Sequence, residues 1–311
     1  MRRILVTGGN GFLGSYVVKE LLKYPNNDVA ILSHSGKKRK HRDLSFIDCD
    51  IRNEKCLANR LKNFDVVYHI AGNTRTSKTD TYQLHHDINA IGTFNLLKSC
   101  DKNGIKRFIF ISTSEVYGNI SKEGISEDEK ISPANDYARS KAEAEGYCRD
   151  YANTKKVKIT IIRPSYIYGY GQNPERLFPK LISSAVRYAR QKNGHAHNGL
   201  SPNLGGNDFV YVKDAAKGIV LLGQQEHELY LEIYNIASGR FAAIKEVFGI
   251  VEELTGYGYA DVKMGYGKVK KYSLSIEKAK KRGYNPEYGL KDGVADFLTY
   301  YNKEKEEVKI I

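Results

Sequence analysis

Tryptophan is absent from this chain of 311 residues, and cysteine is scarce, with four residues in all. The cysteines are Cys49, Cys56, Cys100 and Cys148, and no two of them form a CxxC pair. Scattered cysteines of this kind argue against a disulfide framework and against a zinc site. We therefore predict reduced thiols that pack as small hydrophobic side chains, and we expect no bound metal.

The sequence also lacks an apolar run long enough for a signal peptide or a membrane span. Met1, Arg2 and Arg3 lead directly into the short strand-like segment 4–6, and glycines follow at once. We predict a cytoplasmic protein without membrane contact.

Acidic residues are too few to balance the basic ones, since 36 Asp and Glu stand against 49 Lys and Arg and the formal net charge is +13. Such an excess suits a nucleic-acid surface, an anionic substrate or a lysine-rich solvated surface. The cations lie in separate turn-like clusters, among them 37–42, 155–156, 268–271 and 278–282. Because no single helix or strand gathers them, we expect a solvated surface first, an anionic small substrate second, and no nucleic-acid partner.

Short apolar segments alternate with amphipathic ones through the first half of the chain, which is typical of a parallel sheet covered by helices on both faces. Beyond Pro164, loops rich in Gly, Asn and Pro take over. We predict an α/β protein with a doubly wound parallel sheet over residues 1–165, to which part of 207–240 returns, and a smaller substrate-binding lobe over 166–311. The predicted strands are 4–8, 29–33, 44–48, 66–70, 107–112 and 158–163, and the predicted helices are 12–23, 87–102 and 137–153.

Four glycines follow the first predicted strand and precede the first predicted helix, and they fit both Gly9-x-Gly11-x-x-Gly14 and Gly8-x-x-Gly11-x-x-Gly14. In this context the first glycine permits a tight turn, the second lets the backbone approach a pyrophosphate, and the third lets the helix lie close to the sheet. The N–H groups of the helix that begins with Phe12-Leu13 then face the anion. The pattern predicts a dinucleotide site.

The end of the second predicted strand bears on the choice of dinucleotide. An NAD site favours a carboxylate there to bind the ribose hydroxyls. Here the strand ends in Ser33, and the cations Lys37, Lys38 and Arg39 follow. A hydroxyl backed by cations suits the 2′-phosphate of NADP, although the same cations also suit an ordinary basic turn. We predict NADP in preference to NAD.

Candidate catalytic groups lie at the end of the fifth predicted strand, at Thr113, and at the start of the helix that follows. Tyr137 and Lys141 stand four positions apart on that helix, so the phenol and the ammonium share one face. A nearby cation lowers a phenol pKa that is normally near ~10, which would make Tyr137 a general base. The spacing recurs elsewhere in the chain, but only this copy follows a strand end that carries hydroxyl groups.

Seven motifs occur in order along residues 3–300, namely VTGGNGFLG, VVYHIAG, ISTSEVYG, YARSK, IIRPSYIYGYGQ, DFVYVKD and YNIASG. Together they resemble the extended short-chain dehydrogenase/reductase family, and in particular its NAD(P)-dependent nucleotide-sugar epimerase and dehydratase branch. The resemblance implies a Rossmann domain with a substrate lobe, catalysis by Thr113, Tyr137 and Lys141, and transient oxidation of a nucleotide sugar. The further cofactor contacts that it implies are Asp50, Ile51, Ala71, Gly72 and Asn89.

A homodimer is also implied by the resemblance. The helices beginning near Asp87 and Tyr137 would pair across a two-fold axis into a four-helix bundle. The candidate apolar contacts are Leu96, Leu97, Ala138 and Ala142, unless they are buried against their own sheet.

Two positions depart from the family pattern. Asn207 stands where an Arg often binds the substrate diphosphate, and Tyr166 stands where an Asn contacts the substrate. The candidate cations for the diphosphate are Arg75, Arg176 and Lys180. Beside its Thr, a 4,6-dehydratase of the family needs an Asp-Glu pair, whereas here Ser114, a poor proton donor, precedes Glu115.

These departures order the candidate reactions. A 4-epimerase needs neither carboxylate, so we rank 4-epimerisation first, dehydration second and decarboxylation third. The alternative is an NADPH-dependent reductase or dehydrogenase that acts on a sugar or another carbonyl compound. A catalytically silent sensor on the same fold is disfavoured because the Thr, Tyr and Lys are all present.

Overall fold

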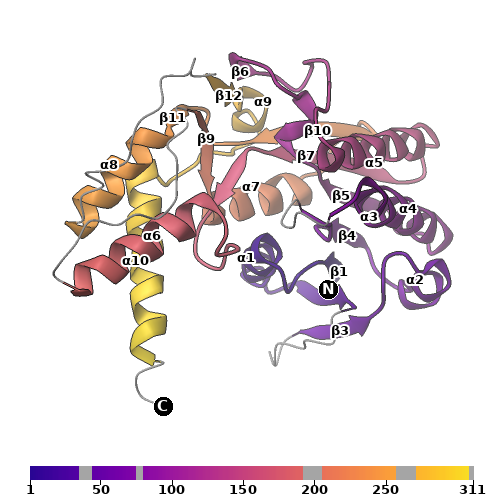
Figure 1. The fold of residues 1–311 in the computed structure, drawn as a ribbon. Coiled ribbons are helices and arrows are strands. Elements are labelled where there is room, and N and C mark those ends of the chain that lie inside the picture. Colours follow the sequence, from indigo (N-terminus) through magenta and orange to yellow (C-terminus); the bar gives the residue numbers. More distant parts are fainter. Residues whose placement is uncertain (35–43, 75–79, 192–204, 257–270, 308–311) are drawn as a thin grey trace.

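A computed structural model describes residues 1–34, 44–74, 80–191, 205–256 and 271–307. Its centre is a seven-stranded sheet in the order β10-β7-β5-β4-β1-β2-β3, in which every neighbouring pair is parallel (Figure 1). The predicted fold class, a doubly wound parallel sheet, is confirmed. The strands are β1 (Arg2–Thr7), β2 (Asn27–Ser33), β3 (Ser45–Asp48), β4 (Val66–His69), β5 (Arg107–Ile111), β7 (Lys158–Pro164) and β10 (Leu231–Ile236).

Both faces of this sheet are buried, because successive side chains of a strand point to opposite sides. In β1, Ile4 and Val6 belong to one hydrophobic core and Leu5 belongs to the other. The first core is covered by α1 (Phe12–Leu21) and α7 (Val212–Gln224). The second core is covered by α2 (Glu54–Arg60), α4 (Gly92–Lys102) and α5 (Asp136–Asn153).

The helical stretch after β4 is longer than predicted. It begins with α3 (Tyr82–His85), continues through the π-helical segment η1 (His86–Ile91) and ends with α4. Leu96, Leu97 and Ala138 are fully buried within their own chain. Of the two alternatives that the sequence left open for these three residues, burial in the protomer's own core therefore holds, whereas Ala142 is partly exposed.

The second lobe lies beside the main sheet, with α6 (Leu177–Gln191), α8 (Ile244–Thr255) and α10 (Leu290–Glu307) around a small sheet (Figure 1). That sheet contains β8 (Tyr166–Tyr168), β9 (Gly206–Tyr211) and β11 (Phe241–Ala243). Aromatic rings fill its core, and those of Tyr168 and Phe178 stack at 4.1 Å. The remaining elements are η2 (Ser114–Tyr117), β6 (Lys122–Ile125), β12 (Tyr272–Leu274) and α9 (Glu277–Lys280).

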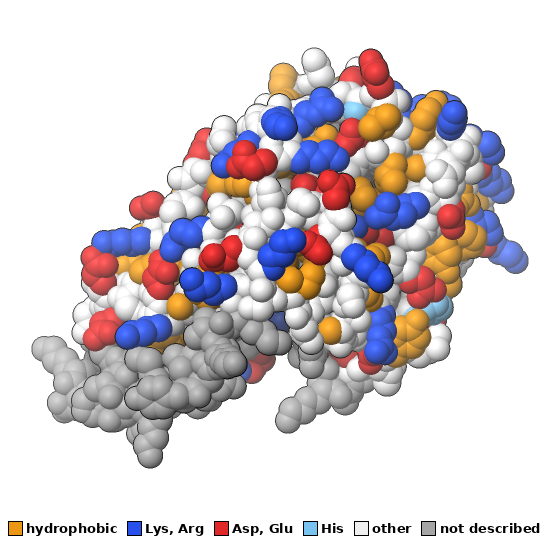
Figure 2. All heavy atoms as spheres, turned by 90° about the horizontal axis from the view of Figure 1, so that it is seen from above, with side chains coloured by type: hydrophobic (Ala, Val, Ile, Leu, Met, Phe, Trp, Pro, Cys, Tyr) orange, Lys and Arg blue, Asp and Glu red, His pale blue; other side chains and the backbone are white. Residues whose placement is uncertain are grey.

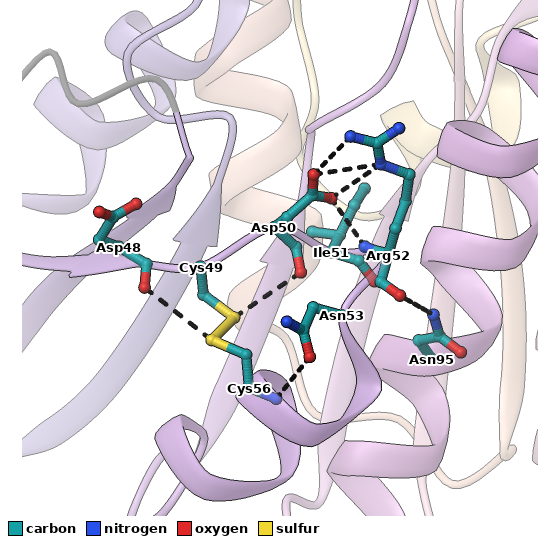
Figure 3. The surroundings of a disulfide bond; sticks show 8 residues. All are labelled: Asp48, Cys49, Asp50, Ile51, Arg52, Asn53, Cys56 and Asn95. Carbon is teal, nitrogen blue, oxygen red and sulfur yellow. Dashed lines mark hydrogen bonds and ion pairs between the residues drawn. A yellow bond between two sulfur atoms is a disulfide. The ribbon is translucent and has the colours of Figure 1, made fainter.

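Cys49 and Cys56 form a disulfide, with their Cα atoms 6.1 Å apart (Figure 3). The prediction that all four thiols are reduced is wrong for this pair. Cys49 follows β3 and Cys56 lies in the first turn of α2, where Asn53 caps the helix by accepting from the Cys56 N–H at 3.0 Å. The sharp entry into α2 thus brings together two cysteines that sequence spacing did not pair. Cys100 and Cys148 are free and buried, as predicted.

Acidic and basic side chains are interspersed over the face of the molecule seen from above (Figure 2). Ion pairs such as Lys98–Glu54 and Lys156–Asp101 reflect the same mixing. Among the described residues, no helix is both long enough and apolar enough to cross a membrane.

Candidate active site

The strand order reverses at β1, which has β2 on one side and β4 on the other. In an open α/β sheet, ligands bind outside the carboxyl ends of the strands at such a point. Gly8, Ile70 and Ser112 directly follow β1, β4 and β5. The residues just beyond these strand ends therefore build the candidate site.

The glycine turn after β1 fits a dinucleotide. Gly8 has a φ of +71°, and a Cβ on it would lie 2.7 Å from the Ala71 nitrogen. A Cβ on Gly14 would lie 2.1 Å from the Gly8 carbonyl oxygen, so helix α1 can approach the turn only because this residue is glycine. Gly11 is the N-cap of α1, with no side-chain cap and no acidic residue in the first turn. The N–H groups of the first helical turn, which begins with Phe12-Leu13, thus remain suited to an anion.

Asp50 and Ile51 lie in the loop between β3 and α2 (Figure 3). The Arg52 guanidinium binds the Asp50 carboxylate, with Nη2 2.6 Å from Oδ2, and this pairing lowers the carboxyl pKa. Asn95 of α4 holds the loop by donating to the carbonyls of Ile51 and Arg52. Sequence reasoning missed Arg52 and Asn95. Ser33 ends β2 opposite Asp48 of β3, and Lys37 lies outside the described residues.

Asn89 fixes the segment after β4 that contains Ala71 and Gly72. Its Oδ1 accepts from the Asn73 N–H at 2.7 Å, and its Nδ2 donates to the Asn73 carbonyl at 3.0 Å and to Ser140 Oγ at 2.9 Å. The buried Nδ2 of Asn73 has no hydrogen-bond partner among the described residues. A buried unpaired donor beside the glycine turn is a second feature that fits a polar ligand such as a dinucleotide.

Thr113, Tyr137 and Lys141 lie together at the end of β5. Asn135 begins α5 by accepting from the Ala138 N–H at 2.9 Å, which places Tyr137 in the first turn and Lys141 one turn on. Burial raises the pKa of Tyr137, as does the charge of Glu115, while a hydrogen bond with Thr113 lowers it.

Lys141 is buried, with Nζ 4.2 Å from the centre of the Phe110 ring. Burial lowers its pKa to about 7. Sequence spacing predicts that Lys141 lowers the pKa of Tyr137. In the structure, burial raises the pKa of this phenol by more than the charge of Arg176 lowers it, which the spacing alone does not reveal. The influence of Lys141 on Tyr137 stays a prediction.

A buried ion pair anchors the catalytic helix to the sheet. Arg163 of β7 forms two bonds to the Glu145 carboxylate of α5, at 2.9 and 2.6 Å. Ser112, which precedes Thr113, donates to the same carboxylate at 2.7 Å. Sequence reasoning missed this pair, because the two residues come from elements that only the fold brings together.

The predicted substrate residues are more loosely held. The exposed Glu115 accepts from Asn135 Nδ2 at 2.7 Å, and its charge raises the pKa of Tyr137 and of Tyr166. Arg176, just before α6, lowers the pKa of the same two phenols, although burial is the largest influence on both. The structure thus brings Glu115 and Arg176 within electrostatic reach of both Tyr137 and Tyr166.

Two other predicted substrate residues, Ser114 and Asn207, form hydrogen bonds elsewhere. Ser114 is buried and uses its carbonyl to accept from the Tyr272 hydroxyl at 3.3 Å. Asn207 accepts from the N–H of its neighbour Asp208 at 2.9 Å, and Arg75 lies outside the described residues. His85 of α3 is buried, and its ring centre lies 6.0 Å from that of Tyr137.

A turn that fits a dinucleotide, with a Tyr and a buried Lys one helical turn apart beside it, defines the site of a dinucleotide-dependent enzyme. Comparison with known proteins agrees: residues 4–237 match the model of the NAD dependent epimerase/dehydratase family. The protein belongs to this family and is an enzyme of the extended short-chain dehydrogenase/reductase type, as the sequence motifs predicted.

Three relatives illustrate the similarity. The low-salt glycan biosynthesis protein Agl12 of Haloferax volcanii is 30% identical over 97% of this chain and 99% of its own. The crystal structure of UDP-glucose 4-epimerase from Thermotoga maritima with UDP-glucose has a TM-score of 0.83 at 28% identity, covering 97% of this chain and 99% of its own. A dTDP-glucose 4,6-dehydratase from Streptomyces venezuelae, solved with NAD, has a TM-score of 0.83 at 27% identity, covering 98% of both chains.

Proposed function

We propose that this enzyme interconverts the C4 epimers of a nucleotide sugar through transient oxidation at C4. The observation that carries the proposal is the group formed by Thr113, Tyr137 and Lys141 at the dinucleotide end of β5. Tyr137 would take the proton of the C4 hydroxyl while Thr113 holds the phenol oxygen by its hydrogen bond. When bound, the dinucleotide supplies a hydride acceptor and donor.

The proton transfer requires that Tyr137 ionise in a site that raises its pKa. Arg176 and the Thr113 hydroxyl favour the ionised form, whereas burial and Glu115 oppose it. Lys141, whose pKa is about 7, would orient the nicotinamide ribose from one turn along α5. The resulting 4-keto sugar would then rotate in the site and present the other face of C4 to the dinucleotide. Tyr137 would return the proton to the C4 oxygen.

Dehydration is the second candidate, and the position of Glu115 favours it. Its carboxylate acts electrostatically on Tyr137 and Tyr166, so it faces the region where a sugar would lie. A base there would remove the C5 proton, which the C4 ketone acidifies. The partner acid is missing, because Ser114 occupies its position and is a poor proton donor.

Turnover in deuterated water separates these reactions. Purified enzyme is incubated with UDP-glucose, UDP-glucuronic acid and dTDP-glucose, and the products are analysed by mass spectrometry and NMR. We expect an unlabelled C4 epimer with the cofactor used catalytically. Deuterium at C5 with loss of water would establish dehydration, and stoichiometric loss of NADPH absorbance would establish net reduction.

For the cofactor we keep NADP as the proposed preference, because β2 ends in Ser33 without a carboxylate. Asp48 of β3 lies beside Ser33. Its negative charge argues against NADP, because it would repel a 2′-phosphate. NAD is the dinucleotide bound in the solved dehydratase from Streptomyces venezuelae. Calorimetry with both dinucleotides tests the proposal, and Asp48→Asn should tighten NADP binding alone. Tighter binding of NAD by the wild type would overturn it.

We further propose a cytoplasmic homodimer built on α4 and α5. Phe94 of α4 and Tyr147 and Tyr151 of α5 form a partly exposed aromatic cluster, with ring centres 5.0 and 6.3 Å from that of Phe94. Apolar rings on two adjacent helices suit pairing with a second copy. Light scattering at micromolar concentration should give the mass of a dimer, and Phe94→Glu should give that of a monomer. A monomeric wild type would refute the proposal.

A further inference from the structure

A continuous chain of buried hydrogen bonds runs from β1 through the last residue of β4 to the start of α4 and on to η1. His69, the last residue of β4, lies with Nδ1 2.7 Å from Thr7 Oγ1 and Nε2 2.9 Å from Thr93 Oγ1. Thr7 Oγ1 accepts from the Ala71 N–H at 3.1 Å, and Thr93 Oγ1 donates to the Asn89 carbonyl at 2.6 Å. Thr7, His69 and Thr93 are fully buried.

When the ring of His69 is neutral, these contacts are compatible with only one arrangement of hydrogens. The single hydroxyl hydrogen of Thr93 is used on the Asn89 carbonyl, so Thr93 must accept from His69 Nε2–H. A neutral imidazole then leaves Nδ1 as an acceptor, and Thr7 donates to it. Burial lowers the pKa of His69 well below its usual value, and the charge of Lys141 lowers it further. The ring is therefore neutral at physiological pH.

Each end of the chain leads to the proposed catalytic groups. At one end the Ala71 N–H belongs to the segment 71–73, whose Gly72 lies so near Lys141 that an added Cβ would be 3.9 Å from Nζ. At the other end the Asn89 amide binds both Asn73 and Ser140. Ser140 Oγ in turn donates to the Tyr137 carbonyl at 2.8 Å. One network thus joins the segment 71–73 to the backbone of the catalytic helix.

We propose that His69 is a positioning residue, which in its neutral Nε2–H form holds the cofactor-lining segment 71–73 in register with the helix that carries Tyr137 and Lys141. This proposal rests on the proposed dinucleotide chemistry. It assigns a role to a side chain that touches neither substrate nor cofactor. A protonated His69 would not serve, because both ring nitrogens would then donate and the Thr7 hydroxyl would have to turn away from the ring.

The first test is spectroscopic and independent of catalysis. Long-range 15N–1H NMR of the uniformly labelled protein distinguishes the tautomers of its eight histidines. The His69 signals are identified by their loss in His69→Gln and, if that variant does not fold, by their shift in Thr93→Ser. We expect a protonated Nε2 and a bare Nδ1 that do not titrate between about pH 5.5 and 8. A protonated Nδ1, or a ring that titrates in this range, would overturn the proposal.

The second test compares isosteric and conservative variants at the two threonines. Thr7→Val should weaken binding of NAD by about tenfold, the effect of one lost buried hydrogen bond, and Thr7→Ser should restore it. Thr93→Val should lower kcat by about tenfold while KM for the sugar stays within about twofold, and Thr93→Ser should restore kcat. Valine variants that lose thermal stability but keep wild-type NAD affinity and kcat would show a purely structural role.

The two proposals fail in different ways. If the wild type turns over no nucleotide sugar, the proposed function fails, whereas the tautomer and the NAD affinities still decide the role of His69. If the wild type is active but the serine variants do not restore the NAD affinity and the kcat that the valine variants lose, the positioning role is overturned and the proposed function stands.

Discussion

The two sides of the candidate active site differ in how deeply their residues are buried. On the dinucleotide side, Gly14 and Asn89 are buried and Lys141 packs on an aromatic ring. On the sugar side, Glu115 is exposed and Arg176 stands in the short stretch before α6. We infer that a buried dinucleotide half beside a more exposed substrate half allows epimerases and dehydratases to share this fold, since a solved example of each has a TM-score of 0.83 to this chain.

On the dinucleotide side, we expect the largest effect on activity from Tyr137→Phe. Without the phenol hydroxyl, the group proposed to take the proton of the C4 hydroxyl is lost, so kcat should fall by about 10³-fold. NAD affinity and the far-UV spectrum should stay near wild type, because the ring still fills its partly buried position. A variant that keeps the wild-type rate would show that another residue is the base.

A methyl group added to the glycine turn should abolish dinucleotide binding. In Gly14→Ala the Cβ would lie 2.1 Å from the Gly8 oxygen, so α1 must move away from the turn. The matched control is Gly146→Ala in α5, where a Cβ meets nothing within 4 Å. That control should bind NAD normally and gain about 0.5–1 kcal/mol of stability from its helix propensity. Calorimetry and urea unfolding measure both variants, and equal NAD affinities would refute the steric argument.

Lys141 should reduce stability in a pH-dependent way. Its folded pKa of about 7 lies below the unfolded value of 10.5, so the full cost of burying the ammonium is present below pH 7. As pH rises from 7 towards 10.5, the folded protein is already neutral at this site and the cost is relieved. Lys141→Met should therefore be more stable than wild type at pH 6, with a gain about 2–3 kcal/mol smaller at pH 9.

Urea unfolding of both proteins at the two pH values measures this difference. Other titrating groups are common to wild type and variant and cancel in the comparison. An equal gain in the free energy of unfolding at pH 6 and pH 9 would mean that burial does not shift the pKa of Lys141.

The Cys49–Cys56 disulfide closes a short loop that contains Asp50 and Ile51. Reducing it should lower the free energy of unfolding by roughly 2–3 kcal/mol, through the greater freedom of the unfolded chain. The double variant Cys49→Ser with Cys56→Ser should match the reduced wild type and should not respond to reductant. Urea unfolding with and without reductant tests this, and identical midpoints for the wild type would show that the bond contributes nothing.

The smallest effect is expected on the sugar side. Arg176→Ala should raise KM for the nucleotide sugar by about five- to tenfold, as for one partly exposed charge contact, with a lesser fall in kcat. Arg139→Ala is the control, since its side chain is 60% exposed and paired with Asp136. Equal KM values for the two variants would remove Arg176 from the substrate site.

The sequence was informative wherever a signal is local. Apolar runs predicted six of the seven strands of the main sheet to within a few residues, all but β10, and the glycine spacing predicted the turn after β1. It was uninformative where the element was short or the contact distant. Helix α2, with seven residues, was missed, and so was the disulfide at its first turn. The roles of Arg75 and Lys37 stay predictions, because both lie outside the described residues.

Sequence by itself determined the parallel α/β architecture, the glycine turn and the family, because spacing and order along the chain encode them. Only the tertiary structure decided the state of the groups within that frame. His69 is neutral because burial lowers its pKa, and its proton lies on Nε2 because Thr93, far from it in sequence, meets that nitrogen. Lys141 has a pKa of about 7 because the folded chain excludes water around it. Protonation and hydrogen-bond direction depend on burial and on distances across the sheet, and spacing along the chain specifies neither.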